Sequence, residues 1–148
     1  MMISIIDQQT LDIDWFFMND SFIGFVASGG GRLPDSAAKS IENNKSLTLF
    51  FRSLPAISDV IINPDLNKIV TTAIDEMYLS DFVDMAKKGL FSFDKTNPNS
   101  FSDSNYHLVA TPVDPLRFDQ LPFEIKGILE ESKYNGEIES SIDINSIS

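Results

Sequence analysis

Aromatic and β-branched residues gather in two short segments near the N-terminus, residues 15–18 and 22–28, and three glycines follow them. Such residues favour extended strands, and Asn19-Asp20-Ser21 between the two segments are turn-forming residues. Consecutive glycines hold a strand poorly. The stretch therefore predicts a β-hairpin whose second strand ends at Gly29.

The first strand of this hairpin is apolar on both sides. Trp15 and Phe17 point one way along an extended chain and Phe16 points the other way. We therefore expect both faces of the strand to be covered, either because it is central in the sheet or because it caps a binding surface. Core packing is the interpretation we favour.

Helical and extended patterns alternate through the rest of the chain. Leu33-Pro34-Asp35-Ser36 predicts a helix start, Pro55 a helix end, and Gly89 after two lysines a helix stop. Apolar residues recur at helical spacing from Leu66 onward, which fits two helices, or one helix with a break near Tyr78–Asp81. The expected helices are 37–42, 46–54, 66–77, 79–88 and 122–129, the expected strands 60–62 (buried), 90–94 and 106–110, and the expected polar loop 95–105.

This order predicts an α+β fold, with a small, mainly antiparallel sheet and helices packed on one face. Residues 1–134 are expected to form a single globular domain, since 148 residues favour one domain and suffice to bury one core. Residues 135–148 read as a polar C-terminal extension, which either lies on the surface or adds a strand.

The chain is strongly acidic, with 22 acidic and 11 basic residues and a formal net charge of −11. The excess is spread along the chain and not held in one acidic tail. Such a surface repels nucleic acid and anionic lipid and attracts a basic protein partner. Solubility alone also explains a charge of this size.

Several classes of protein are disfavoured by what the sequence lacks. Without cysteine there is no disulfide framework, no thiolate zinc site and no cysteine nucleophile. The N-terminus lacks the pattern of a signal peptide, and no apolar run approaches the roughly 18 residues that span a bilayer. We therefore expect a cytoplasmic protein with no membrane association.

The single histidine, His107, is the main candidate for chemistry. A catalytic histidine requires a nucleophile and an orienting carboxylate in space, and no Gly-x-Ser-x-Gly motif marks a serine for that role. A zinc site would have to combine His107 with carboxylates alone, which is uncommon. A structural role is the favoured interpretation.

Gly29-Gly30-Gly31-Arg32 and the paired carboxylates are weaker candidates. The glycine run could cradle a phosphate with Arg32 as a clamp, but the Lys-Ser/Thr of the phosphate-binding motif is missing, so a tight loop is favoured. The segment 94–99 lacks the spacing of a calcium loop. We therefore predict no metal, no cofactor and no catalytic residue.

Three short motifs resemble a known group of proteins. Asp14-Trp15-Phe16, a second strand that runs through Phe25 to Ser28-Gly29-Gly30-Gly31, and the helix start Leu33-Pro34 resemble small bacterial immunity proteins of polymorphic or contact-delivered toxin systems. The resemblance covers residues 12–34. Where the pattern has Asp-x-x-Gly at the turn, this chain has Asn19-Asp20-Ser21. The resemblance implies a protein that binds a cognate toxin and blocks it.

We therefore expect a binding protein that occludes a basic toxin domain, with exposed acids near helix ends as contacts: Asp75, Glu76, Asp81 and Asp84. One alternative is a small enzyme or ligand-binding domain that uses carboxylates with Arg32 and His107, which requires a pocket where His107 meets a carboxylate. The other is a structural or regulatory subunit that forms a homodimer through an exposed strand. The chain is expected to be a monomer or a homodimer.

Overall fold

The computed structural model describes all 148 residues and confirms the predicted α+β class. Its single sheet has six strands, and β2–β4 is the one parallel pair among antiparallel neighbours. In chain order the elements are α1 (Ile5–Thr10), β1 (Asp14–Met18), β2 (Ile23–Ala27), α2 (Asp35–Ala38), α3 (Ile41–Arg52), β3 (Val60–Ile62), the 3₁₀ turn η1 (Leu66–Lys68), α4 (Glu76–Lys87), β4 (Phe91–Lys95), β5 (Asn105–Pro112), η2 (Phe118–Gln120), α5 (Phe123–Leu129), β6 (Ser141–Asp143) and η3 (Ile144–Ser146).

The predicted N-terminal hairpin is present as β1 and β2, and its turn chemistry explains its register. The Asn19 side-chain oxygen accepts hydrogen bonds from the backbone N–H of Ser21 at 3.2 Å and of Phe22 at 2.8 Å. Asp20 has a φ of 78°, a left-handed conformation that Asp tolerates better than most residues. Three polar residues thus fix a tight connection between two apolar strands.

Both faces of β1 are buried, as predicted, but β1 is not central. Trp15 and Phe17 pack into one core and Phe16 into another, on opposite sides of the sheet. The strand order β1-β2-β4-β5-β3 places β1 at one end of the sheet. Its outer edge is covered by the chain after α5, because Met18 N–H donates to the Ser132 carbonyl at 3.0 Å and Tyr134 N–H to the Met18 carbonyl at 2.8 Å.

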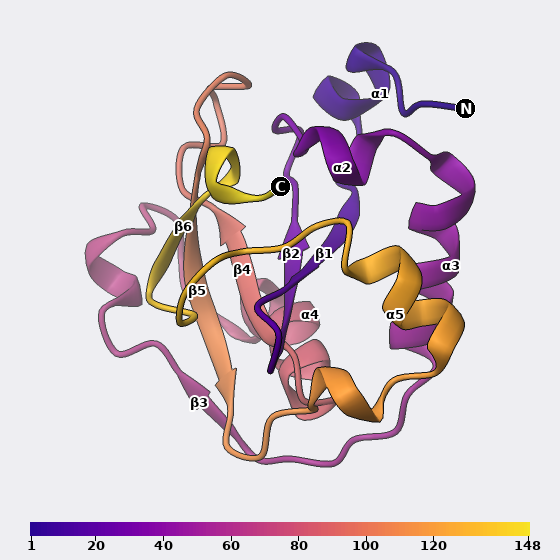
Figure 1. Cartoon of the computed structure of the whole chain (residues 1–148). Helices are drawn as coiled ribbons and strands as arrows, with labels where there is room; N and C mark the ends of the chain where they lie inside the picture. Colours follow the sequence, from indigo (N-terminus) through magenta and orange to yellow (C-terminus); the bar gives the residue numbers. More distant parts are fainter.

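The longest helices pack on one face of the sheet, and shorter segments cover the other (Figure 1). The buried side chains of α3, α4 and α5 share one core with Phe16 and Phe25. The N-terminal segment, α2 and the C-terminal segment cover the opposite face. None of the helices combines the length and the apolar composition that a membrane span requires.

Two predicted helices between residues 37 and 54 are wrong in their bounds. The structure has a single turn, α2, and then, after two intervening residues, a continuous α3. Ser40 caps α3, and its hydroxyl accepts a hydrogen bond from Asn43 N–H at 3.1 Å. Asn44 does not weaken the helix, because its side chain donates to the Asp14 carbonyl at 2.8 Å.

The helix predicted over residues 66–77 is also wrong, and so is the break near Tyr78–Asp81. The apolar stripe forms only η1, and the chain then runs without regular structure to Asp75. Asp75 caps α4 by accepting a hydrogen bond from Tyr78 N–H at 2.9 Å. Helix α4 is continuous from there to Lys87, and Gly89 follows it with a φ of 98°, as the predicted helix stop requires.

Strand β5 is lined on its outer edge by two short strands. β3 pairs with its second half and β6 with its first half, so residues 135–148 do add a strand. Ile142, Ile144 and Ile147 are buried in the core that contains Trp15. Strand β3 was expected to be buried, but Ile61 is 57% exposed because β3 is an edge strand.

Candidate functional site

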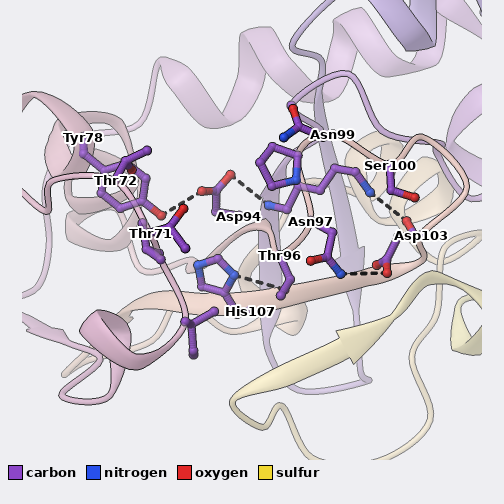
Figure 2. Close-up of a pocket in the computed structure, with 15 residues that line it drawn as sticks. Thr71, Thr72, Tyr78, Asp94, Thr96, Asn97, Asn99, Ser100, Asp103 and His107 are labelled. Atoms are coloured by element: carbon purple, nitrogen blue, oxygen red, sulfur yellow. Dashed lines mark hydrogen bonds between the residues drawn. The ribbon is translucent and has the colours of Figure 1, made fainter.

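A hollow of about 520 Å³ opens where β4 ends and β5 begins (Figure 2). One wall is the polar loop between these strands, and the other is the irregular segment before α4. Helix α4 contributes a single residue, Tyr78. The lining residues are Gly29, Ile69, Val70, Thr71, Thr72, Tyr78, Asp94, Lys95, Thr96, Asn97, Pro98, Asn99, Ser100, Asp103 and His107.

Strand register brings a carboxylate and the only imidazole together. Asp94 of β4 and His107 of β5 are directly opposite in the antiparallel ladder, so their side chains lie on the same face. From α4, the Tyr78 hydroxyl donates to Asp94 Oδ2 at 2.7 Å, and Lys95 N–H donates to Asp94 Oδ1 at 2.8 Å. The carboxylate therefore has one donor on each oxygen and an unused lone pair on each.

Burial dominates the electrostatics of this pair. It raises the pKa of Asp94, although the hydrogen bonds from Tyr78 and Lys95 act in the opposite direction. Burial, together with the neighbouring charge of Asp94, also raises the pKa of the Tyr78 hydroxyl. At neutral pH the phenol is therefore a fixed hydrogen-bond donor and not a base.

His107 is only 3% exposed, and one of its ring nitrogens has no partner. Nδ1 shares a hydrogen bond of 3.1 Å with Thr96 Oγ1, whereas the buried Nε2 has none. Burial lowers the pKa of His107 to about 4, so the ring is neutral at pH 7. A nucleophile–histidine–carboxylate triad needs a carboxylate on the second nitrogen, and Nε2 has no such neighbour in hydrogen-bond contact.

Side chains of the loop itself fix its shape. Asp103 accepts from Asn97 Nδ2 at 2.8 Å and from Asn105 N–H at 2.9 Å. Lys95 Nζ donates to the Asp103 carbonyl at 2.7 Å and lies 5.4 Å from the centre of the Tyr106 ring. Lys95 is the only cationic residue in the lining, and its ammonium group points at the Asp103 carbonyl of the loop.

The glycine run lies beside this site, and its geometry explains its composition. Gly29 and Gly30 have φ values of 54° and 76°, which favour glycine. A Cβ on Gly31 would lie 2.6 Å from Lys95 Cδ and 2.8 Å from the Tyr106 hydroxyl oxygen. Arg32 does not line the hollow; its guanidinium donates to Asn145 Oδ1 at 3.0 Å. The run therefore forms a tight loop against β4 and β5.

The four acids suggested as partner contacts have different surroundings. Asp81 forms a bidentate pair with Arg52 at 2.6 and 3.0 Å, and Arg52 also holds Asp14, so the two carboxylates share one cation. Asp75 caps α4, and Asp84 lies in a shallow hollow beside Lys87 and Lys88. Glu76 is exposed and has no hydrogen-bond or ion-pair partner. The structure does not gather them into one acidic patch.

Sequence reasoning missed Asp94, Tyr78 and the threonines of residues 71–72 as parts of a site. The segment 94–99 was considered only as a calcium loop, and the pairing of Asp94 with His107 depends on strand register. No group of three or more His, Asp or Glu side chains is placed to hold a metal ion.

Comparison with protein families, with curated proteins and with solved structures finds no match to this chain. The hollow and the charge distribution are therefore the features of the chain that bear on its function.

Proposed function

We propose that this chain is a non-catalytic inhibitor of the immunity type, which binds a basic protein toxin and occludes it. The unpaired negative charge carries this proposal. Seven of the 22 acidic side chains lie within 4 Å of a cationic group, which leaves 15 whose field is not cancelled locally. Such a field steers a basic partner toward the surface and raises its association rate.

The resemblance of residues 12–34 to immunity proteins supports the same function. In this chain those residues build β1, β2 and the N-cap of α2, and four of their aromatic side chains, Trp15, Phe16, Phe17 and Phe25, are buried. They therefore support a shared fold, while the surface that meets the partner is formed elsewhere.

The decisive experiment uses the gene neighbourhood. The gene immediately upstream should encode a large secreted protein with a variable C-terminal domain. Expression of that domain alone should stop growth, and co-expression of this chain should restore growth. If the two proteins are both folded and abundant and growth is not restored, the proposal is wrong.

A second measurement tests the electrostatic reason. Charge steering predicts that the association rate constant with the purified toxin domain falls by about tenfold or more when salt is raised from 50 to 500 mM, while the dissociation rate changes less. An association rate that is independent of salt would contradict the role given to charge.

The hollow at His107 and Asp94 favours a second candidate, a small ligand-binding or enzymatic domain. It contains the histidine and carboxylates that such a domain needs, although Arg32 lies outside it. A soluble ligand would raise the melting temperature in a concentration-dependent way, by binding only the folded state. A thermal-shift screen of sugars, nucleosides and amino acids that finds such a ligand, with no inhibition of the neighbouring toxin, would favour this candidate. A homodimeric role instead predicts a dimer mass by light scattering.

A further inference from the structure

The hollow contains a polar ring nitrogen that no group of the chain satisfies. The imidazole of His107 is almost fully buried, Nδ1 is engaged by Thr96, and Nε2 is a buried polar atom without a partner. In Figure 2 the ring lies between Thr96 and Thr71, below Asp94. Unpartnered buried polar atoms are rare in folded proteins, and one in the wall of a hollow indicates a missing hydrogen-bond partner.

The other polar groups around the hollow supply several acceptors. Each oxygen of Asp94 accepts one hydrogen bond and has room for another. The lining adds the hydroxyl and amide oxygens of threonines, asparagines and Ser100. The one lysine is held by the Asp103 carbonyl and balances one of the two carboxylates in the lining, Asp94 and Asp103, so the lining keeps an excess of negative charge. Anionic ligands are therefore disfavoured, and a cationic group rich in N–H donors is favoured.

Access to Nε2 requires only a local adjustment. Thr71 to Ile74 form no backbone–backbone hydrogen bond and belong to no helix or strand. Thr71 and Thr72 are exposed. A segment of this kind can shift at little cost, because no ladder has to break.

We propose that this hollow receives the guanidinium of an arginine side chain presented by the partner protein. A guanidinium has five N–H donors in a planar fork, which suits a carboxylate, hydroxyl and amide oxygens, and an imidazole nitrogen that lie around one space. The proposal rests on the proposed function, since it names the group by which a basic partner is recognised. It makes Asp94 the main charge contact, and it requires the tautomer of His107 in which Nδ1–H donates to Thr96 Oγ1, so that Nε2 is an acceptor.

The test does not need the partner. N-acetyl-arginine amide is titrated into ¹⁵N-labelled protein, with N-acetyl-citrulline amide as the neutral isostere and ionic strength kept constant. The arginine probe should shift the amide signals of residues 71–72, 94–97 and 103 and the Nε2 signal of His107, with a dissociation constant on the order of millimolar. The citrulline probe should bind about tenfold more weakly or not at all.

Two variants distinguish binding in the hollow from non-specific attraction to the acidic surface. Asp94→Asn removes one charge in the hollow and keeps an acceptor for Lys95 N–H, so it should weaken the arginine probe about tenfold. Glu124→Gln removes one charge from an exposed position on α5, outside the hollow, and should leave binding unchanged. Shifts that are equal for arginine and citrulline, or equal losses in both variants, would overturn the proposal, as would tight binding of glucose to the same residues.

The two proposals fail in different ways. If the arginine probe binds as expected but no toxin is inhibited, the hollow is an arginine site and the immunity function is wrong. If a toxin complex forms and Asp94→Asn leaves its dissociation rate unchanged, the arginine site is wrong and the immunity function stands.

Discussion

Replacement of His107 should change how stability depends on pH. Burial lowers the pKa of the folded imidazole to about 4 from an ordinary value of 6.5. Between pH 6.5 and pH 4 the unfolded chain therefore binds a proton that the folded chain does not. The free energy of unfolding must fall as pH falls through this window, and the contribution of His107 is fully present only above pH 6.5.

The magnitude follows from the two pKa values. Full protonation of His107 would lower the free energy of unfolding by about 3 kcal/mol, and the part of this loss that falls between pH 7.5 and pH 5.0 is about 2 kcal/mol. That is a large part of the roughly 5–15 kcal/mol that stabilises a typical domain. We choose pH 5.0 as the lower limit because the isoelectric point is near 4.3, where a protein of this kind precipitates readily.

Urea unfolding, followed by the fluorescence of the single and fully buried Trp15, measures this difference directly. His107→Gln removes the titration but keeps a side chain that can hydrogen-bond to Thr96. The loss of stability between pH 7.5 and 5.0 should therefore be about 2 kcal/mol smaller in the variant. The raised pKa of Asp94 has the opposite effect on stability, and it is present in both proteins. Equal pH dependence in the two proteins, or an imidazole NMR titration centred near 6.5, would refute the reasoning.

Three other substitutions test the packing, each by urea unfolding at pH 7.5. Gly24→Ala places a Cβ into the buried ring of Phe17 across the hairpin, so it should destabilise the fold by about 1–3 kcal/mol or more. Ile142→Ala removes a side chain that is 2% exposed and should cost about 2–5 kcal/mol; a loss below 1 kcal/mol would mean that the C-terminal segment is not part of the core. Arg52→Met breaks two ion pairs at a partly exposed position, so the free energy of unfolding should fall by less than about 1 kcal/mol. A larger loss would show that these ion pairs contribute more than exposed pairs usually do.

The hairpin was predictable because its signals are local and agree with one another. Alternation assigned Trp15 and Phe16 to opposite faces, and Asn19 supplied the turn hydrogen bonds. The helix stop at Gly89 was predictable for the same reason. The position of β1 at the sheet edge was not, because an edge strand covered by a distant segment carries the same apolar pattern as a central one.

Helix bounds failed where capping competed with periodicity. The stripe from Leu66 to Met77 has helical spacing, yet Asp75 accepts from Tyr78 N–H and starts α4 at Glu76. A capping side chain satisfies a free backbone donor at the helix start, so it can define a boundary that the apolar pattern ignores.

The candidate site is formed by segments whose structure the sequence did not predict. One wall is the segment of residues 69–72, which sequence periodicity assigned to a helix, and the other is the loop of residues 96–103, which its composition assigned to solvent. Asp94 and His107 meet between them because a hairpin register pairs positions that are 13 residues apart. A shift of that register by one residue would turn one of the two side chains to the opposite face. The site is therefore a property of strand pairing, and its chemistry cannot be read from either segment alone.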